Sequence, residues 1–365
     1  MSNCGERLKF MIMAGGTGGH VFPALAVAHE LRRRGHEVVW MGAPDSFESR
    51  TVPAQGFEIE FIRITGLRGK GIGALIGAPL RLLRAAAQAW SILSRRRPNA
   101  VLGMGGFASG PGGLVARLRN IPLLVHEQNA APGLTNRLLS RIAQHVLEAF
   151  PGTFKSAQTV GNPVRPGFEE LEDPSVRAQH RAGKALHVLV IGGSQGARAL
   201  NERLPQALAL MTPEERPQLR HQAGRTLEVA KQTYLASGVD AVIEAFIEDM
   251  PAAFAQADLV VCRAGASTIA ELSAAGCAAL LVPYPFAVDD HQTRNAQHLT
   301  SVNAARMIAE SELTPQRLAD ELRELLSDRT RLIDMARAAR SNAWNGATQA
   351  IADTCERAAL RGAAT

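Results

Sequence analysis

The chain has 365 residues, of which 46% are hydrophobic and 20% charged, as is typical of a soluble globular protein of two domains. Its four scattered cysteines exclude a disulfide framework and a structural zinc site. Residues 1–163 hold 19 Lys+Arg and 9 Asp+Glu, and residues 164–365 hold 21 and 25, which gives the +6 of the whole chain. The basic first half is expected to meet an anionic partner, and the aromatic content of 5% disfavours nucleic acid.

Two apolar runs each lead into a glycine-rich turn. Residues 8–14 precede Gly-Gly-Thr-Gly-Gly-His at 15–20, and residues 187–191 precede Gly-Gly-Ser-Gln-Gly-Ala at 192–197. A helical pattern follows each turn. Such a strand–turn–helix unit directs backbone N–H groups and a helix N-terminus at one point, which suits phosphate. Neither turn completes a dinucleotide fingerprint or a Walker loop. The pair predicts two nucleotide-binding folds.

Strands and helices are expected to alternate along the chain. Strands are predicted at 8–14, 37–41, 57–61, 99–103, 122–126, 144–148, 157–160, 186–192, 218–222, 239–244, 257–262, 278–282 and 304–308. Helices are predicted at 22–34, 73–95, 110–118, 133–141, 197–210, 225–236, 266–275, 290–301, 314–327 and 343–362. This order is typical of parallel sheets covered on both faces. Residues 161–166 are the expected linker between domains at 1–163 and 164–342, with the terminal helix (343–365) packing back on the first domain.

The segment 75–93 contains no acidic residue. On a helix it would collect its apolar side chains on one face and arginines and polar residues on the other. The apolar face comprises Ile76, Leu80, Leu83, Ala87 and Trp90. One interpretation is an ordinary helix covering the sheet. The other is a membrane patch of Leu75, Ile76, Leu80 and Trp90, which with nearby Arg68, Lys70, Arg81 and Arg84 rests on anionic lipid.

Further polar clusters follow predicted strands. A third glycine-rich turn spans 103–113, and His-Glu-Gln-Asn follows at 126–129. Because strand C-termini meet at one edge of a parallel sheet, both clusters should border the first glycine turn. In the second half, residues 263–271 combine a glycine turn, a helix start and Glu271, which suits phosphate and a ribose diol, and residues 289–295 follow. The alternative for Glu271 is a solvated helix acid. The lack of Asp-x-Asp argues against a metal-bound sugar nucleotide.

Taken in order, these motifs resemble the MurG family, the bacterial glycosyltransferases of peptidoglycan synthesis, over essentially the whole chain. The resemblance implies an α/β fold of the glycosyltransferase B architecture, in which two Rossmann-like domains with parallel sheets face a cleft. It implies transfer of N-acetylglucosamine from UDP-N-acetylglucosamine to lipid I, giving lipid II, with no cofactor and no metal. It also implies a peripheral location on the cytoplasmic face of the inner membrane, with cell-wall synthesis proteins as candidate partners.

The resemblance also assigns residues. The donor-binding set it implies is Thr17, Gly18, Gly19, Asn129, Arg165, Ser194, Ile247, Ala266, Ser267, Thr268, Ile269, Ala270, Glu271 and Gln292. Within this set, Arg165 and Ser194 would meet the diphosphate, Glu271 the ribose and Gln292 the sugar hydroxyls. The acceptor diphosphate is assigned to Gly105, Gly106 and Ser109.

The expected chemistry is direct displacement with inversion. An acceptor hydroxyl attacks the anomeric carbon as UDP leaves, and a general base removes its proton. His20 is the first candidate because it ends the first glycine turn and has a suitable ordinary pKa, and Glu127 is the second. The alternative for His20 is an orienting hydrogen-bond partner. At the level of the whole protein, a non-hydrolysing UDP-sugar epimerase, a nicotinamide dehydrogenase and a non-catalytic nucleotide-binding module stay open.

Overall fold

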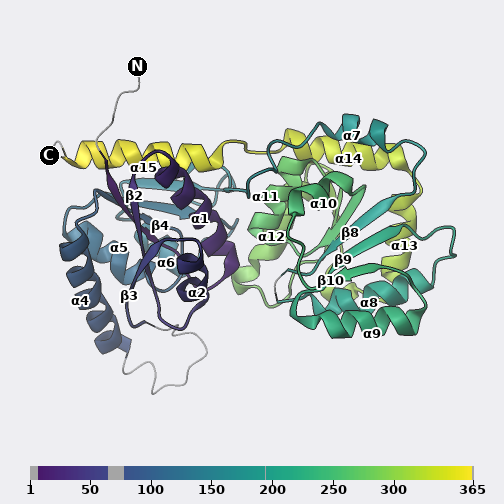
Figure 1. Ribbon diagram of the computed structural model, residues 1–365, viewed down its shortest axis with the longest axis horizontal. Helices are drawn as coiled ribbons and strands as arrows, with labels where there is room; N and C mark the ends of the chain where they lie inside the picture. Colours follow the sequence, from purple (N-terminus) through teal and green to yellow (C-terminus); the bar gives the residue numbers. More distant parts are fainter. Residues whose placement is uncertain (1–6, 65–77, 194, 364–365) are drawn as a thin grey trace. The chain divides into compact units, whose positions relative to one another are not determined.

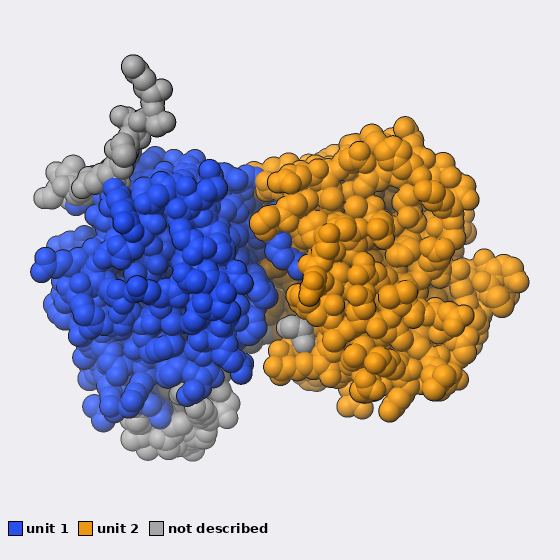
Figure 2. Space-filling model, viewed as in Figure 1, with its two compact units in different colours: residues 1–165, 346–365 blue, residues 166–345 orange. Residues whose placement is uncertain are grey.

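The computed structural model describes residues 7–64, 78–193 and 195–363. The chain divides into two compact units (Figure 2). Unit 1 comprises Met1–Arg165 and Gly346–Thr365, and unit 2 comprises Pro166–Asn345. Each unit is built on one parallel sheet, as the alternating pattern predicted.

Unit 1 contains a sheet of seven described strands in the order β3-β2-β1-β4-β5-β6-β7 (Figure 1). The strands are β1 (Lys9–Met13), β2 (Glu37–Gly42), β3 (Glu58–Phe61), β4 (Ala100–Gly103), β5 (Leu123–Glu127), β6 (His145–Glu148) and β7 (Gln158–Thr159). Met13 at the end of β1 pairs with Met41 and with Gly103. This register brings the loops after β1, β2 and β4 to one edge of the sheet.

Helices cover both faces of this sheet. They are α1 (Gly18–Arg33), α2 (Phe47–Ala54), α4 (Ala78–Arg96), α5 (Ser109–Leu118), α6 (Leu134–Leu139) and α15 (Ala347–Ala363). Side chains of β1 alternate between the two layers. Phe10 and Ile12 pack in the core that α1 and α15 share, whereas Met11 and Met13 pack in the core of α4 and α5.

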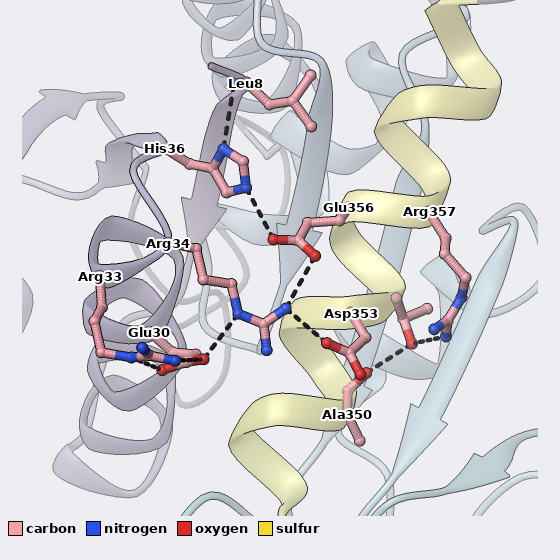
Figure 3. Close-up of polar contacts among 10 residues, drawn as sticks. Leu8, Glu30, Arg33, Arg34, His36, Ala350, Asp353, Glu356 and Arg357 are labelled. Atoms are coloured by element: carbon pink, nitrogen blue, oxygen red, sulfur yellow. Dashed lines mark hydrogen bonds and ion pairs between the residues drawn. The ribbon is translucent and has the colours of Figure 1, made fainter. Parts of the chain in front are cut away.

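The C-terminal helix α15 belongs to unit 1 and is tied to α1 by charged side chains (Figure 3). The Arg34 guanidinium donates to Asp353 at 2.6 Å and to Glu356 at 2.9 Å. His36 Nε2 lies 2.9 Å from the same Glu356 carboxylate, and His36 Nδ1 accepts the Leu8 N–H at 3.3 Å. These contacts, with Ile351 and Cys355 buried against the sheet, fix α15 beside α1.

Unit 2 contains a sheet of six described strands in the order β10-β9-β8-β11-β12-β13. The strands are β8 (His187–Ile191), β9 (Gln218–Gln222), β10 (Val242–Glu244), β11 (Leu259–Cys262), β12 (Ala279–Leu281) and β13 (Ala305–Met307). The helices are α7 (Pro174–His180), α8 (Arg198–Ala209), α9 (Leu227–Ser237), α10 (Met250–Gln256), α11 (Ala266–Ala275), α12 (His291–Thr300), α13 (Pro315–Leu326) and α14 (Arg329–Ser341). Short 3₁₀ turns are η1 (Gly224–Thr226), η2 (Val288–Asp290) and η3 (Glu310–Glu312).

Four helices were missed in the sequence: α2, α7, α10 and α14. Proline explains most of the misses. Pro174 and Pro251 stand in the first turns of α7 and α10, where the missing N–H has no intrahelical partner to lose, and Asp173 and Asp249 cap these helices. Helix α2 has eight residues and carries Pro53 in its last turn.

Candidate active site

In unit 1 the first and third glycine turns pack directly on each other. The Gly15 N–H donates to the Gly105 carbonyl at 3.2 Å. Gly105 and Gly106 adopt positive φ angles of 96° and 91°. A Cβ on Gly106 would lie 2.7 Å from the Gly15 nitrogen, so only glycine fits there. The prediction that these two turns meet is confirmed. Thr17, Gly18 and Gly19, which follow in the first turn, are partly or fully exposed.

Ser109 lies beneath these turns. Its buried hydroxyl is 2.9 Å from the Met13 carbonyl and 2.8 Å from the Gly105 carbonyl. One hydroxyl proton is shared between two backbone acceptors, so this side chain supports the loop that carries Gly105.

His20 projects from the first turn of α1 and is partly exposed. Its Nδ1 lies 3.1 Å from the Gly15 carbonyl oxygen. A carbonyl only accepts, so Nδ1–H is the donor in this contact, and the tautomer with its proton on Nδ1 has a lone pair on Nε2. The other edge of the ring lies against Gly105, where a Cβ would be 3.0 Å from Nε2. His20 is thus held by the first glycine turn through Nδ1, with Nε2 beside Gly105.

Glu127 is buried and accepts four hydrogen bonds. One oxygen receives the Asn129 backbone and side-chain N–H groups at 3.0 and 3.2 Å. The other receives the Gly133 N–H at 3.1 Å and the Asn136 amide at 2.9 Å. The carboxylate therefore shapes the loop that follows β5 and sets the position of Asn129.

His126 precedes Glu127 and is fully buried. Burial away from water lowers its pKa to about 4. Its Nε2 donates to the Gly161 carbonyl at 3.0 Å, and its Nδ1 accepts from the Gln128 amide at 3.2 Å. Neutral His126 thus joins the end of β5 to Gly161. Gly161 lies in the segment that leads to Arg165, after which the chain first passes from unit 1 into unit 2.

In unit 2 the second glycine turn is closed by β9. The Gly192 N–H donates to the Gln222 carbonyl at 2.9 Å, and Gly193 and Gly196 have φ angles of 71° and 79°. Helix α8 begins directly after this turn. Ser194 lies outside the described residues. Ile247 is buried after β10, while Phe246 beside it is exposed. The described residues of this turn and Ile247 lie at the C-terminal edge of the second sheet.

The start of α11 lies at the same edge. Gly265 caps the helix, and Ala266, Ser267, Thr268, Ile269 and Ala270 form its first turns. The Ser267 hydroxyl is buried and has no hydrogen-bond partner within the described residues. Glu271 is only 5% exposed, so the alternative of a solvated helix acid is wrong.

The start of α12 completes this edge. The Gln292 side-chain oxygen accepts the Tyr284 N–H at 2.9 Å, which fixes the amide and leaves its NH₂ group as a donor. Asp289 and Asp290 both adopt positive φ angles, 54° and 51°. Two consecutive non-glycine residues in this region store backbone strain, a feature that clusters at functional sites. Residues 289–295 were noted in the sequence, but nothing there predicted a left-handed backbone at this pair.

The predicted membrane segment lies partly outside the described residues, which exclude Leu75, Ile76, Arg68 and Lys70. Within α4, Leu80 is 73% and Leu83 68% exposed, and Trp90 is 47% exposed beneath the Arg119 guanidinium, 4.8 Å from the ring centre. The side facing the sheet carries Ala78, Ala85, Ala89, Ile92 and Leu93. Helix α4 therefore covers the sheet, as one interpretation expected, and the face that carries Leu80, Leu83 and Trp90 is exposed.

Two further observations concern the described part of the chain. None of its helices combines the length and hydrophobicity needed to cross a bilayer. Within the same residues, no cluster of three or more His, Cys, Asp or Glu side chains is arranged to hold a metal ion.

Comparison with known proteins places this site in a family. The profile of the glycosyltransferase family 28 N-terminal domain matches residues 10–148, and that of the C-terminal domain matches residues 187–353. A UDP-N-acetylglucosamine–N-acetylmuramyl-(pentapeptide) pyrophosphoryl-undecaprenol N-acetylglucosamine transferase of Marinobacter nauticus is 52% identical over 97% of this chain and 98% of its own length. A protein of the same name from Nitrosococcus oceani is 54% identical over 95% of this chain and 98% of its own length.

Solved structures show the same relationship as the sequence comparisons. The crystal structure of Acinetobacter baumannii MurG is 42% identical, covers 96% of this chain and 99% of its own, and superimposes with a TM-score of 0.84. The calicheamicin glycosyltransferase CalG4, at 18% identity and a TM-score of 0.68 over 98% of this chain and 99% of its own, shares the fold. Both halves of the chain thus match one group of enzymes, and the chain belongs to the MurG family within glycosyltransferase family 28.

Proposed function

We propose that this chain transfers N-acetylglucosamine from UDP-N-acetylglucosamine to lipid I, the undecaprenyl-pyrophosphoryl-N-acetylmuramoyl-pentapeptide, giving lipid II. The observation that carries the proposal is the near full-length match to relatives that bear the name of this transferase. The epimerase alternative has no support among these relatives, whose names and family profiles describe transferases.

The donor is assigned to the C-terminal edge of the unit 2 sheet. The buried Glu271 carboxylate would accept the ribose hydroxyls, and the Gly192–Ala197 turn with the N-terminus of α11 would meet the diphosphate through backbone N–H groups. The Ser267 hydroxyl, buried without a partner in the described residues, is available as a phosphate donor. Gln292, fixed through Tyr284, would donate its NH₂ group to the sugar.

The acceptor and the general base are assigned to unit 1. The acceptor hydroxyl oxygen attacks the anomeric carbon, the bond to the UDP oxygen breaks, and UDP leaves with the electron pair. Nε2 of His20 takes the hydroxyl proton, because the Gly15 carbonyl already engages Nδ1–H. Arg165 and the second glycine turn stabilise the charge on the leaving diphosphate. Glu127, whose oxygens are occupied by four donors, positions Asn129 and is the weaker candidate for the base.

We also infer that unit 1 docks on the cytoplasmic face of the inner membrane. Leu80, Leu83 and Trp90 form an exposed apolar face on α4, with Arg81 and Arg84 exposed on the same helix. Apolar insertion and attraction of arginine to anionic lipid headgroups would act together. Such docking would bring the acceptor's headgroup to the glycine turns of unit 1.

The proposal is tested by incubating the purified protein with labelled UDP-N-acetylglucosamine, with and without a lipid I analogue. Label should appear in the lipid only when the acceptor is present, and the His20→Ala variant should lose about a hundredfold or more of kcat while donor binding stays nearly normal. Isomerised donor in the absence of acceptor would instead support the epimerase. Wild-type turnover by a folded His20→Ala variant would remove His20 as the base.

A further inference from the structure

A buried carboxylate lies directly behind the first glycine turn. Glu48, the second residue of α2, is 2% exposed. One carboxylate oxygen accepts the Gly16 N–H at 3.0 Å, and the other accepts the Ala43 N–H at 3.1 Å. No basic side chain of the described residues forms an ion pair with it. Backbone donors and the N-terminus of α2 therefore stabilise its charge.

The peptide group that contacts Glu48 also contacts His20. The carbonyl of the peptide between Gly15 and Gly16 accepts the His20 Nδ1–H at 3.1 Å, and the N–H of the same peptide donates to Glu48. Hydrogen bonds arranged in series polarise one another. The negative charge of Glu48 therefore makes the Gly15 carbonyl a stronger acceptor for the imidazole N–H.

We propose that Glu48 is a positioning residue that acts on His20 through the Gly15–Gly16 peptide, holding its Nδ1–H tautomer and stabilising the imidazolium that forms during transfer. The inference rests on the proposed function, in which His20 is the general base. The acceptor proton moves to Nε2 and is released to solvent after the product leaves. Glu48 exchanges no proton in this step.

Two glycines make room for this carboxylate. A Cβ on Gly42 would lie 2.8 Å from the Glu48 Cγ, and a Cβ on Gly15 would overlap the carboxylate itself. A reciprocal capping box between Ser46 and Ser49 fixes the start of α2 and therefore the place of Glu48. The backbone around the turn is thus shaped to admit one buried acid.

The other titratable groups at this edge of the sheet have hydrogen-bond partners outside the first glycine turn. The loop after β4, residues 104–108, carries none. From β5, His126 is bonded to Gly161 and its low pKa keeps it neutral above pH 5, while Glu127 is bonded to the loop it precedes. Among the described residues, Glu48 is the acid that hydrogen bonds connect to the turn bearing His20.

The test is Glu48→Gln, which keeps the shape of the side chain, removes its charge and places an NH₂ group against one of the two N–H donors. We expect kcat to fall about tenfold and the donor KM to stay within about twofold. The acid limb of the pH profile of kcat should move down by about one pH unit, because imidazolium loses a nearby anion. The control is Glu148→Gln, a buried acid of unit 1 that accepts the Gly152 and Phe154 N–H groups and has no bond to the turn.

Two measurements separate this inference from the proposed function. In a His20→Ala background, Glu48→Gln should change kcat by less than about twofold, and an undiminished loss would show that Glu48 acts independently of His20. Wild-type turnover by His20→Ala alone would instead refute the base. Should Glu48→Gln not fold, ¹⁵N NMR of the histidines in the wild-type protein decides the matter. An Nδ1–H signal for His20 supports the proposal, and an Nε2–H tautomer overturns it.

Discussion

Burial of neutral His126 should make unit 1 acid-sensitive. Its pKa is 6.5 in the unfolded chain and about 4 in the fold, because burial opposes the charged form. The contribution of neutral His126 to the free energy of unfolding is therefore complete above pH 6.5. It is lost as the pH falls towards 4, and it changes no further below both pKa values. Between pH 8 and pH 5 the difference amounts to about 2 kcal/mol of unfolding free energy.

Urea unfolding, followed by the fluorescence of Trp40 and Trp90 in unit 1, measures this loss in a Trp344→Phe background that silences unit 2. The comparison is between His126 and a His126→Gln variant, in which this position does not titrate. The chain with His126 should lose about 2 kcal/mol more between pH 8 and pH 5 than the variant does. Equal losses in the two chains would refute the assignment of His126 as a buried neutral imidazole.

Three sets of substitutions test the glycine turns, the exposed face of α4 and the donor site. Gly106→Ala should lower activity or prevent folding, because Gly106 has a positive φ and a Cβ there would meet the Gly15 backbone. Gly133→Ala should be tolerated, because its Cβ would meet no atom within 4 Å. Equal melting temperatures and turnover in the two variants would contradict this expectation. The double variant Leu80→Ser, Leu83→Ser should co-sediment less with anionic liposomes, whereas Leu235→Ser on the exposed face of α9 should not. Unchanged binding by the double variant would refute the role of this face of α4 in membrane docking. Glu271→Ala should raise the donor KM, because it removes charge-assisted hydrogen bonds worth about 1.5–3 kcal/mol. In a separate chelator titration, strict dependence of activity on a divalent ion would contradict a metal-free donor site.

The parallel two-sheet fold was predictable from the sequence because buried strands form continuous apolar runs that end in glycine turns. Helix α4 was harder to interpret. Leu80, Leu83 and Trp90 are exposed, whereas the side facing the sheet carries Ala78, Ala85, Ala89, Ile92 and Leu93. Both sides carry apolar residues, so hydrophobicity alone does not show which face of α4 packs on the sheet.

Site residues that depend on tertiary contacts were not predictable in the same way. Glu48 stands in a short helix that contains a proline, and its partner Gly16 is 32 residues away. The segment 289–295 was noted in the sequence, but the left-handed conformation of Asp289 and Asp290 was not predicted. By contrast, His20 and Glu271 were identified as candidates because each closes a glycine turn or follows one on a helix.

The proposed transfer of the sugar to a lipid acceptor is a single displacement and therefore inverts the anomeric carbon. It is measured with UDP-N-acetylglucosamine labelled with ¹³C at the anomeric carbon, a lipid I analogue and the purified chain, with NMR of the product. We expect one lipid-linked product in which the labelled carbon has the anomeric configuration opposite to that of the donor. Retention of configuration, or label that leaves UDP without reaching the lipid, would contradict it.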